Sequence, residues 1–252
     1  MIKLENVVLA SPKQMEFIIE GMRNPKNSWG KSDSVIGCYI CGHDEDPHSC
    51  YCCDVPQYEG CNSNPEYCLG KNDHSLMQRL SNAGTEHRKY MRMMPVYVRI
   101  TAPLYWWKEF DTYKVGTVTN SCSTMHKIAE KEFTMEDFSC EHLFLESLAS
   151  LSRTIRTLNE YRNLYVEGGS ILISEDRFLS FKPKDKEIWW QLIQLLPSSY
   201  NQTRNVMLNY EVLANIYRQR HGHKLDEWRE VCKWIESLPY SELITGNGEA
   251  TN

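Results

Sequence analysis

Apolar residues along the chain follow two kinds of spacing, and each kind predicts a class of element. Short apolar stretches predict strands at 4–10 and 96–102, the second of which alternates apolar and polar positions. Spacings of three and four residues predict helices at 11–23, 72–93, 139–167, 187–196, 198–222 and 224–239. Ser11 and Pro12 suit the cap and first turn of the earliest helix, and Gly168-Gly169 suits the end of the long one. The pattern therefore predicts an α/β (α+β) protein that is rich in helix.

The expected organisation is one domain at 1–245, with a cysteine-rich insertion at 38–68 and a frayed tail at 246–252. A chain of 252 residues that is 41% hydrophobic can bury a sizeable core. No internal repeat or low-complexity linker interrupts the sequence. The lysine-rich run at 181–186 is expected to be a polar connection.

The charge balance argues against duplex nucleic acid as a partner. The chain carries 28 basic and 33 acidic side chains, so it lacks the positive surplus that drives non-specific binding to phosphate backbones. No uncharged apolar run approaches the roughly 18 residues of a membrane span, and the N-terminus has no secretory hydrophobic region. We therefore expect a cytoplasmic protein with no membrane partner.

Seven of the ten cysteines fall between Cys38 and Cys68. Two C-x2-C pairs in this segment have the spacing of tetrahedral zinc ligands, and they consist of Cys38 with Cys41 and Cys50 with Cys53. Their separation is shorter than in common zinc ribbons. A structural zinc site and a surface loop of reduced thiols both remain open, whereas a disulfide framework is disfavoured without a secretion signal.

One segment between the second predicted strand and Lys127 resembles the fingerprint of the flavin-dependent thymidylate synthases. Those enzymes show P-I-F, a glutamine, R-H-R-x-x-S and then N-E-x-S-x-R-Y. In this chain the first three elements correspond, without a gap, to Pro103-Leu104-Tyr105, Glu109, Thr112-Tyr113-Lys114 and Thr117. With one inserted residue, Asn120 and Ser123 match the later Asn and Ser, and Met125 replaces an arginine.

A second segment resembles the same family at the end of the chain. The family pattern N-x-R-x-L, continued by a second Asn and an Arg, matches Asn209, Leu213, Asn215 and Arg220 without gaps. Glu211 stands where the family has an arginine that helps to hold the flavin. Upstream, His87 is the surviving residue of a G-H-x-S-x-x-E-H element.

The resemblance implies a central, mostly antiparallel sheet, a homotetramer, and FAD and dUMP held in pockets shared between chains. The implied reaction is FAD-dependent reductive methylation of dUMP to dTMP, with methylene-tetrahydrofolate and NADPH as co-substrates. The residues implied to bind FAD are His87, Tyr113, Lys114, Thr117, Asn209 and Asn215. Those implied to bind dUMP are Glu109, Asn120, Ser123 and Arg220, with Ser123 and Arg220 also catalytic.

The departures from the fingerprint keep other functions open. Thr112 and Met125 remove two permanent positive charges, and each lost charge-assisted hydrogen bond costs about 1.5–3 kcal/mol of binding. Residues near enough in sequence to compensate are Arg88, Lys108, His126 and Lys127. One alternative is a nucleotide-binding protein of the same fold without methyl transfer, acting as a sensor, scaffold or inhibitor. Another is an interaction module that recruits a partner through the cysteine cluster.

Overall fold

The computed structural model describes residues 2–37, 66–174 and 177–246, and these form two compact units. The first unit contains Met1–Glu5, Arg99–Lys114 and Thr119–Val206. The second contains Asn6–Val98, Val115–Val118 and Met207–Asn252. The candidate zinc ligands Cys38, Cys41, Cys50 and Cys53 lie outside the described residues, so zinc stays a prediction, as does the single domain at 1–245.

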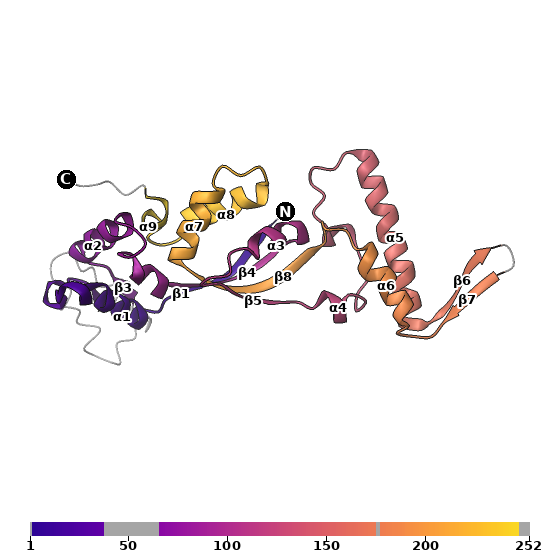
Figure 1. Ribbon diagram of the computed structural model, residues 1–252, viewed down its shortest axis with the longest axis horizontal. Helices are drawn as coiled ribbons and strands as arrows, with labels where there is room; N and C mark the ends of the chain where they lie inside the picture. Colours follow the sequence, from indigo (N-terminus) through magenta and orange to yellow (C-terminus); the bar gives the residue numbers. More distant parts are fainter. Residues whose placement is uncertain (1, 38–65, 175–176, 247–252) are drawn as a thin grey trace, which may run out of the picture. The chain divides into compact units, whose positions relative to one another are not determined.

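A four-stranded antiparallel sheet occupies the centre of the fold in the order β1-β4-β8-β5 (Figure 1). Its strands are β1 (Lys3–Leu9), β4 (Pro95–Pro103), β8 (Asn201–Asn209) and β5 (Val118–Ser121). Each strand begins in one unit and ends in the other. In the first unit, the hydroxyls of Thr101 on β4 and Thr203 on β8 lie 2.8 Å apart. The expected helix-rich fold with a central, mostly antiparallel sheet is confirmed.

The first unit adds a helical layer and a β-hairpin to its part of the sheet. Its elements are α3 (Leu104–Phe110), α4 (Thr124–Lys127), α5 (Leu145–Glu167), the hairpin strands β6 (Gly169–Ser174) and β7 (Arg177–Phe181), and α6 (Lys186–Leu195). Figure 1 shows α5 and α6 side by side, with the hairpin extending from one end of them. Leu158 of α5 and Leu192 of α6 are fully buried in one apolar cluster with Phe133 and Phe138.

The second unit packs helices around its part of the sheet. Its elements are α1 (Pro12–Arg23), β2 (Val35–Gly37), β3 (Glu66–Cys68), α2 (Lys71–Asn82), α7 (Tyr210–Arg220), α8 (Asp226–Glu236) and α9 (Glu242–Thr245), with a 3-10 turn at Lys89–Met93. Helix α1 begins as expected, because Ser11 and Gln14 form a reciprocal capping box and Pro12 occupies the first turn. Strand β2, just before the cysteine-rich insertion, pairs antiparallel with β3, which forms the last three residues of the insertion.

Three predicted helices are wrong in part. The segment 198–222 is not one helix: Asn201–Asn209 forms strand β8, in which Gln202, Val206 and Leu208 are buried at every second or fourth position. The helix expected at 72–93 ends at Asn82, because Gly84 takes a φ of +114° that a helix cannot contain. The long helix expected at 139–167 begins only at Leu145.

The carboxylate of Asp73, in the first turn of α2, is buried and accepts hydrogen bonds from the loop that leads into the insertion. One of its oxygens accepts from Arg23 at 2.5 Å, and the other accepts from the hydroxyls of Ser32 at 2.7 Å and Ser34 at 2.6 Å. Neighbouring Asp33 accepts from the backbone N–H groups at the start of α2. Side chains from α1, the loop and α2 therefore converge on one buried charge.

Candidate functional site

The turn before β5 lies against the first residues of α7 in the second unit. Gly116 has a φ of +76°, and a Cβ there would lie 3.0 Å from Nδ2 of Asn209 and 3.1 Å from Val212. Asn209 caps α7, since its side-chain oxygen accepts from the backbone N–H of Val212 at 3.0 Å. The neighbouring Thr117 hydroxyl oxygen is buried and has no hydrogen-bond partner in the described part of the chain. The two segments that carry the family resemblance therefore meet here.

An ion pair lies beside this contact. Nε of Arg88 is 2.8 Å from Oε2 of Glu211, and the two side chains are only 13% and 16% exposed. Arg88 was expected to compensate for a missing positive charge, but Glu211 neutralises the charge of its guanidinium. His87, the preceding residue, is exposed and lies 3.6 Å from Glu86.

Arg220, near the C-terminal end of α7, contacts two other side chains. Its guanidinium carbon lies 4.7 Å from the ring centroid of Trp228, and one nitrogen is 3.0 Å from Nε2 of His223. Asn215, one turn earlier, uses its side-chain oxygen to accept from Arg218 and Gln219 at 3.0 and 3.1 Å. Trp228 and His223 therefore orient Arg220, and the sequence alone did not indicate either contact.

Ser123 lies in the first unit, at the cap of α4. Its hydroxyl accepts from the backbone N–H of His126 at 3.2 Å, and it borders a hollow of about 350 Å³. The basic side chains Lys127 and Lys131 of this hollow pair with Glu130 and Asp137. A hydrogen bond to Asp137 raises the pKa of Lys131 above its ordinary value, so this lysine remains charged.

The other expected site residues of the first unit lie on α3, in the case of Glu109, or in the segment after it. Lys114 and Asn120 are exposed, while Glu109 and Tyr113 are half-buried. Thus Glu109, Tyr113, Lys114, Asn120 and Ser123 belong to the first unit, and His87, Thr117, Asn209, Asn215 and Arg220 belong to the second. The binding of FAD by Lys114 and of dUMP by Arg220 stays a prediction.

Arg204 on β8 is held by three contacts within the first unit. It pairs with Asp111 at 2.7 Å, donates to Gln202, and lies 4.1 Å above the ring of Trp107. Trp106 and Trp107 themselves are buried in the core.

Comparison with known proteins identifies the architecture. No family model matches the sequence, and no curated protein sequence matches it. The flavin-dependent thymidylate synthase ThyX from Helicobacter pylori, solved with FAD and dUMP, has a TM-score of 0.57 at 12% identity and covers 97% of this chain and 96% of its own. The UMP/dUMP methylase PolB from Streptomyces cacaoi, bound with 5-Br dUMP, has a TM-score of 0.52 at 14% identity, covering 98% and 94%. The chain has the flavin-dependent thymidylate synthase fold.

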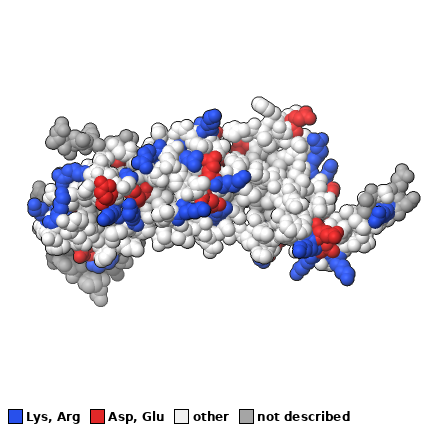
Figure 2. All heavy atoms as spheres, in the orientation of Figure 1, with Lys and Arg blue, Asp and Glu red and all other residues white. Residues whose placement is uncertain are grey.

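Within this thymidylate synthase fold, positive charge is not concentrated on the surface shown in Figure 2. Lys and Arg side chains lie there among Asp and Glu side chains, and a broad part of this face carries neither. No described helix is long and apolar enough to cross a membrane. Among residues 2–37, 66–174 and 177–246, no group of three or more His, Cys, Asp or Glu side chains could hold a metal ion.

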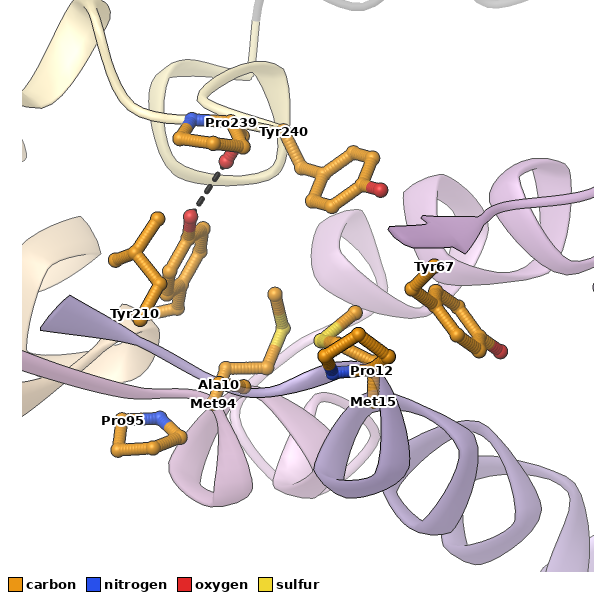
Figure 3. Close-up of a pocket in the computed structure, with 10 residues that line it drawn as sticks. Ala10, Pro12, Met15, Tyr67, Met94, Pro95, Tyr210, Pro239 and Tyr240 are labelled. Atoms are coloured by element: carbon orange, nitrogen blue, oxygen red, sulfur yellow. Dashed lines mark hydrogen bonds between the residues drawn. The ribbon is translucent and has the colours of Figure 1, made fainter. Parts of the chain in front are cut away.

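The thymidylate synthase fold also contains a pocket that the sequence did not indicate. It encloses about 540 Å³ in the second unit, and three tyrosines, Tyr67, Tyr210 and Tyr240, line it (Figure 3). They come from β3, α7 and the loop before α9, so no local spacing could have linked them.

Proposed function

We propose that the protein binds FAD and a pyrimidine nucleotide and catalyses the reductive methylation of dUMP to dTMP. Methylene-tetrahydrofolate would donate the carbon and NADPH the reducing equivalents. The proposal is supported by a thymidylate synthase fold that extends over nearly the whole chain. The two similar structures were solved with dUMP and FAD and with 5-Br dUMP, respectively.

The observation that carries the proposal is the contact between the Gly116–Thr117 turn and Asn209. It joins residues that are far apart in sequence but belong to the two segments of family resemblance. A buried hydroxyl without a partner is costly unless a ligand satisfies it, and Thr117 is such a group. The absence of a Cβ at Gly116 lets the side chains of Asn209 and Val212 pack directly against this turn. These features suit the polar part of a flavin nucleotide at the N-terminus of α7.

The proposed division of labour follows the expected site residues. Thr117 and Asn209 would hold FAD together with His87, Tyr113, Lys114 and Asn215, and the bound flavin would supply hydride chemistry. Glu109, Asn120 and Ser123 would position dUMP. Arg220 would place a permanent positive charge where negative charge develops on the pyrimidine. Because Trp228 supports one face of its guanidinium, the N–H edge is oriented before the ligand binds.

The ion pair of Arg88 with Glu211 supports a second candidate function. The charges of Arg88 and Glu211 cancel at the start of α7, whereas the resembled family has an arginine at position 211. A protein with weakened flavin binding could retain nucleotide binding and act as a sensor, scaffold or inhibitor.

One experiment separates the two candidate functions. Purified protein is incubated with FAD, dUMP, methylene-tetrahydrofolate and NADPH, and the nucleotide is analysed by mass spectrometry. We expect flavin absorbance on the protein, faster NADPH oxidation with dUMP, and conversion of dUMP to dTMP. Binding of dUMP without product would support the second function. If the protein bound neither FAD nor dUMP, both candidate functions would be contradicted.

Arg220→Ala is expected to lower kcat/KM for dUMP about 100-fold, because it removes the charge that stabilises the reacting pyrimidine. The matched control is Arg79→Ala, which removes an exposed arginine of the same unit, on α2. Steady-state kinetics measure both. Equal losses in the two variants would argue that Arg220 acts only through general surface charge.

We further propose that the chain forms a homotetramer in the cytoplasm, and the hairpin of the first unit supports the self-association. Leu172 and Phe178 face each other across β6 and β7 and are 60% and 64% exposed. Phe144 and Leu145, before α5, are 86% and 85% exposed. A two-stranded ribbon is only marginally stable alone in water, so an apolar partner surface would stabilise it.

The double variant Leu172→Asp/Phe178→Asp is therefore expected to have a lower molar mass than the unmodified protein in light scattering, with its helical circular dichroism retained. Phe17→Asp is the control, because Phe17 on α1 is similarly exposed at 63%. A monomeric unmodified protein would contradict the tetramer. An unchanged mass of the double variant would place the interface elsewhere.

A further inference from the structure

The tyrosine pocket, defined by Tyr67, Tyr210 and Tyr240 in the second unit, has a buried floor and a half-open mouth. Met15, Met94 and Tyr210 form the floor and are 6%, 2% and 3% exposed. Tyr67 and Tyr240 are half-buried at its edge. Figure 3 shows the two thioethers between the aromatic rings. A volume of about 540 Å³ lies within the range of small-molecule sites.

The lining of the pocket carries no charge. Its residues are Leu9, Ala10, Pro12, Met15, Tyr67, Met94, Pro95, Tyr210, Pro239 and Tyr240, and none of these described side chains is acidic or basic. Burial raises the pKa of Tyr67 to about 12 and that of Tyr210 still further, so both phenols are neutral at physiological pH. A charged ligand would lose its hydration here without gaining an ionic partner.

Two of the tyrosines are held in unusual ways. The hydroxyl of Tyr210 donates to the carbonyl oxygen of Pro239 at 2.5 Å, which fixes the loop above the floor (Figure 3). The next residue, Tyr240, adopts a φ of +57°, a left-handed conformation that is rare for a bulky side chain. Strained residues of this kind concentrate where a ligand is clamped. The strain places an aromatic ring at the mouth of the pocket instead of a glycine that would fit the backbone without cost.

We propose that the tyrosine pocket binds an uncharged, flat, bicyclic heteroaromatic ring. The phenol rings and the sulfur atoms of Met15 and Met94 provide the contacts that such a ring favours. The hydroxyl of Tyr240 makes no hydrogen bond within the described residues and can pair with a ring nitrogen at the mouth. None of the residues proposed to bind FAD or dUMP lines the pocket, although Tyr210 directly follows Asn209, so the pocket and the proposed methylation site use different side chains.

Indole is a suitable probe, because it is bicyclic, heteroaromatic and uncharged. Saturation-transfer NMR titration of the full chain, without FAD or dUMP, is expected to show saturable binding with a Kd of about 1 mM or tighter. Indole-3-acetate, which adds a carboxylate, is expected to bind at least about fivefold more weakly. Addition of FAD should leave indole binding unchanged.

Two variants locate the bound probe. Ala10→Phe fills the pocket from its wall and is expected to raise the Kd at least about tenfold. Tyr240→Gly removes the ring and relieves the positive φ, so it should weaken binding while retaining or raising the melting temperature. The matched control, Tyr97→Leu, alters a tyrosine of the same unit that is 47% exposed and outside the pocket.

The outcomes are decisive in both directions. Loss of indole binding in both pocket variants, with an unchanged control, supports the site. Absence of saturable binding to the unmodified protein overturns it. Unchanged binding in Tyr240→Gly, or displacement of indole by FAD, also overturns it, since the ring would then bind elsewhere or within the flavin site. If Ala10→Phe does not fold, Tyr240→Gly alone decides the question.

Discussion

Asp73→Asn is expected to destabilise the protein by about 3–5 kcal/mol, the cost of removing one partner of a buried ion pair. The Asp73 side chain is fully buried, and Arg23, its partner, is 4% exposed. The amide would keep the shape of the carboxylate but would leave the buried guanidinium without a counter-charge. It would also turn an acceptor of the hydroxyl and backbone N–H groups of Ser34 into a competing donor. Urea unfolding followed by circular dichroism measures the loss.

The matched control for this prediction is Glu16→Gln. It removes the acidic partner of an exposed pair, since Lys13 and Glu16 are 82% and 50% exposed, and it should change stability by less than about 1 kcal/mol. A loss of stability of similar size in both variants would mean that the burial of Asp73 does not strengthen the contribution of its ion pair.

The same residue gives the direction of a pH effect. Burial alone would raise the pKa of Asp73, but hydrogen bonds from Ser34 and Ser32 and the charge of Arg23 outweigh it, so the pKa lies below its ordinary value. A depressed carboxyl pKa stabilises the fold above the unfolded-state value of about 3.9 and loses that contribution as the pH falls further. Stability of the unmodified protein should therefore drop below about pH 4, and Asp73→Asn should drop less steeply. Parallel pH profiles would contradict this account.

Sequence patterns located those elements whose own residues determine them. Helix α1 was predictable because Ser11, Pro12 and Gln14 supply the cap locally. Helix α6 was predictable from its apolar spacing and from Pro197 just beyond its end. Strand β8 was not predictable, because its residues also fit a helical spacing. They are extended only because β8 pairs with β4 on one side and with β5 on the other.

Sequence resemblance located positions in the candidate site but not the partners of those positions. Asn209 and the Gly116–Thr117 turn meet as two segments of one site should. The pairing of Arg88 with Glu211 could not be read from spacing, because 123 positions separate two residues that meet only in the folded unit. The tyrosine pocket was missed for the same reason, since its aromatic rings come from three separate elements.

The double charge reversal Arg88→Glu/Glu211→Arg is expected to raise FAD affinity by about one to two orders of magnitude, provided that the flavin binds at the start of α7 as proposed. The pair keeps zero net charge, so the gain depends on position: the guanidinium moves onto position 211, where the resembled family has an arginine. A charge-assisted hydrogen bond from its free N–H edge to a phosphate contributes about 1.5–3 kcal/mol. The ion pair itself is retained in reversed order, so stability should stay within about 1 kcal/mol of the unmodified protein.

The single variants define the coupling. Glu211→Arg alone sets two positive charges together in a site where the native side chains are 13% and 16% exposed, so it should destabilise the protein by about 3 kcal/mol. Arg88→Glu alone should do the same with two negative charges. Urea unfolding and quenching of flavin fluorescence, measured on all four proteins, complete a double-mutant cycle for stability and for FAD affinity.

An exposed pair provides the matched control for the reversal. Glu230 and Lys233 on α8 are 49% and 69% exposed, and Glu230→Lys/Lys233→Glu should change neither quantity. If the double reversal were as unstable as the single variants, the Arg88–Glu211 contact would not be the source of the coupling. If it were stable but bound FAD no better, position 211 would not face the cofactor, and the flavin would have to lie away from the start of α7.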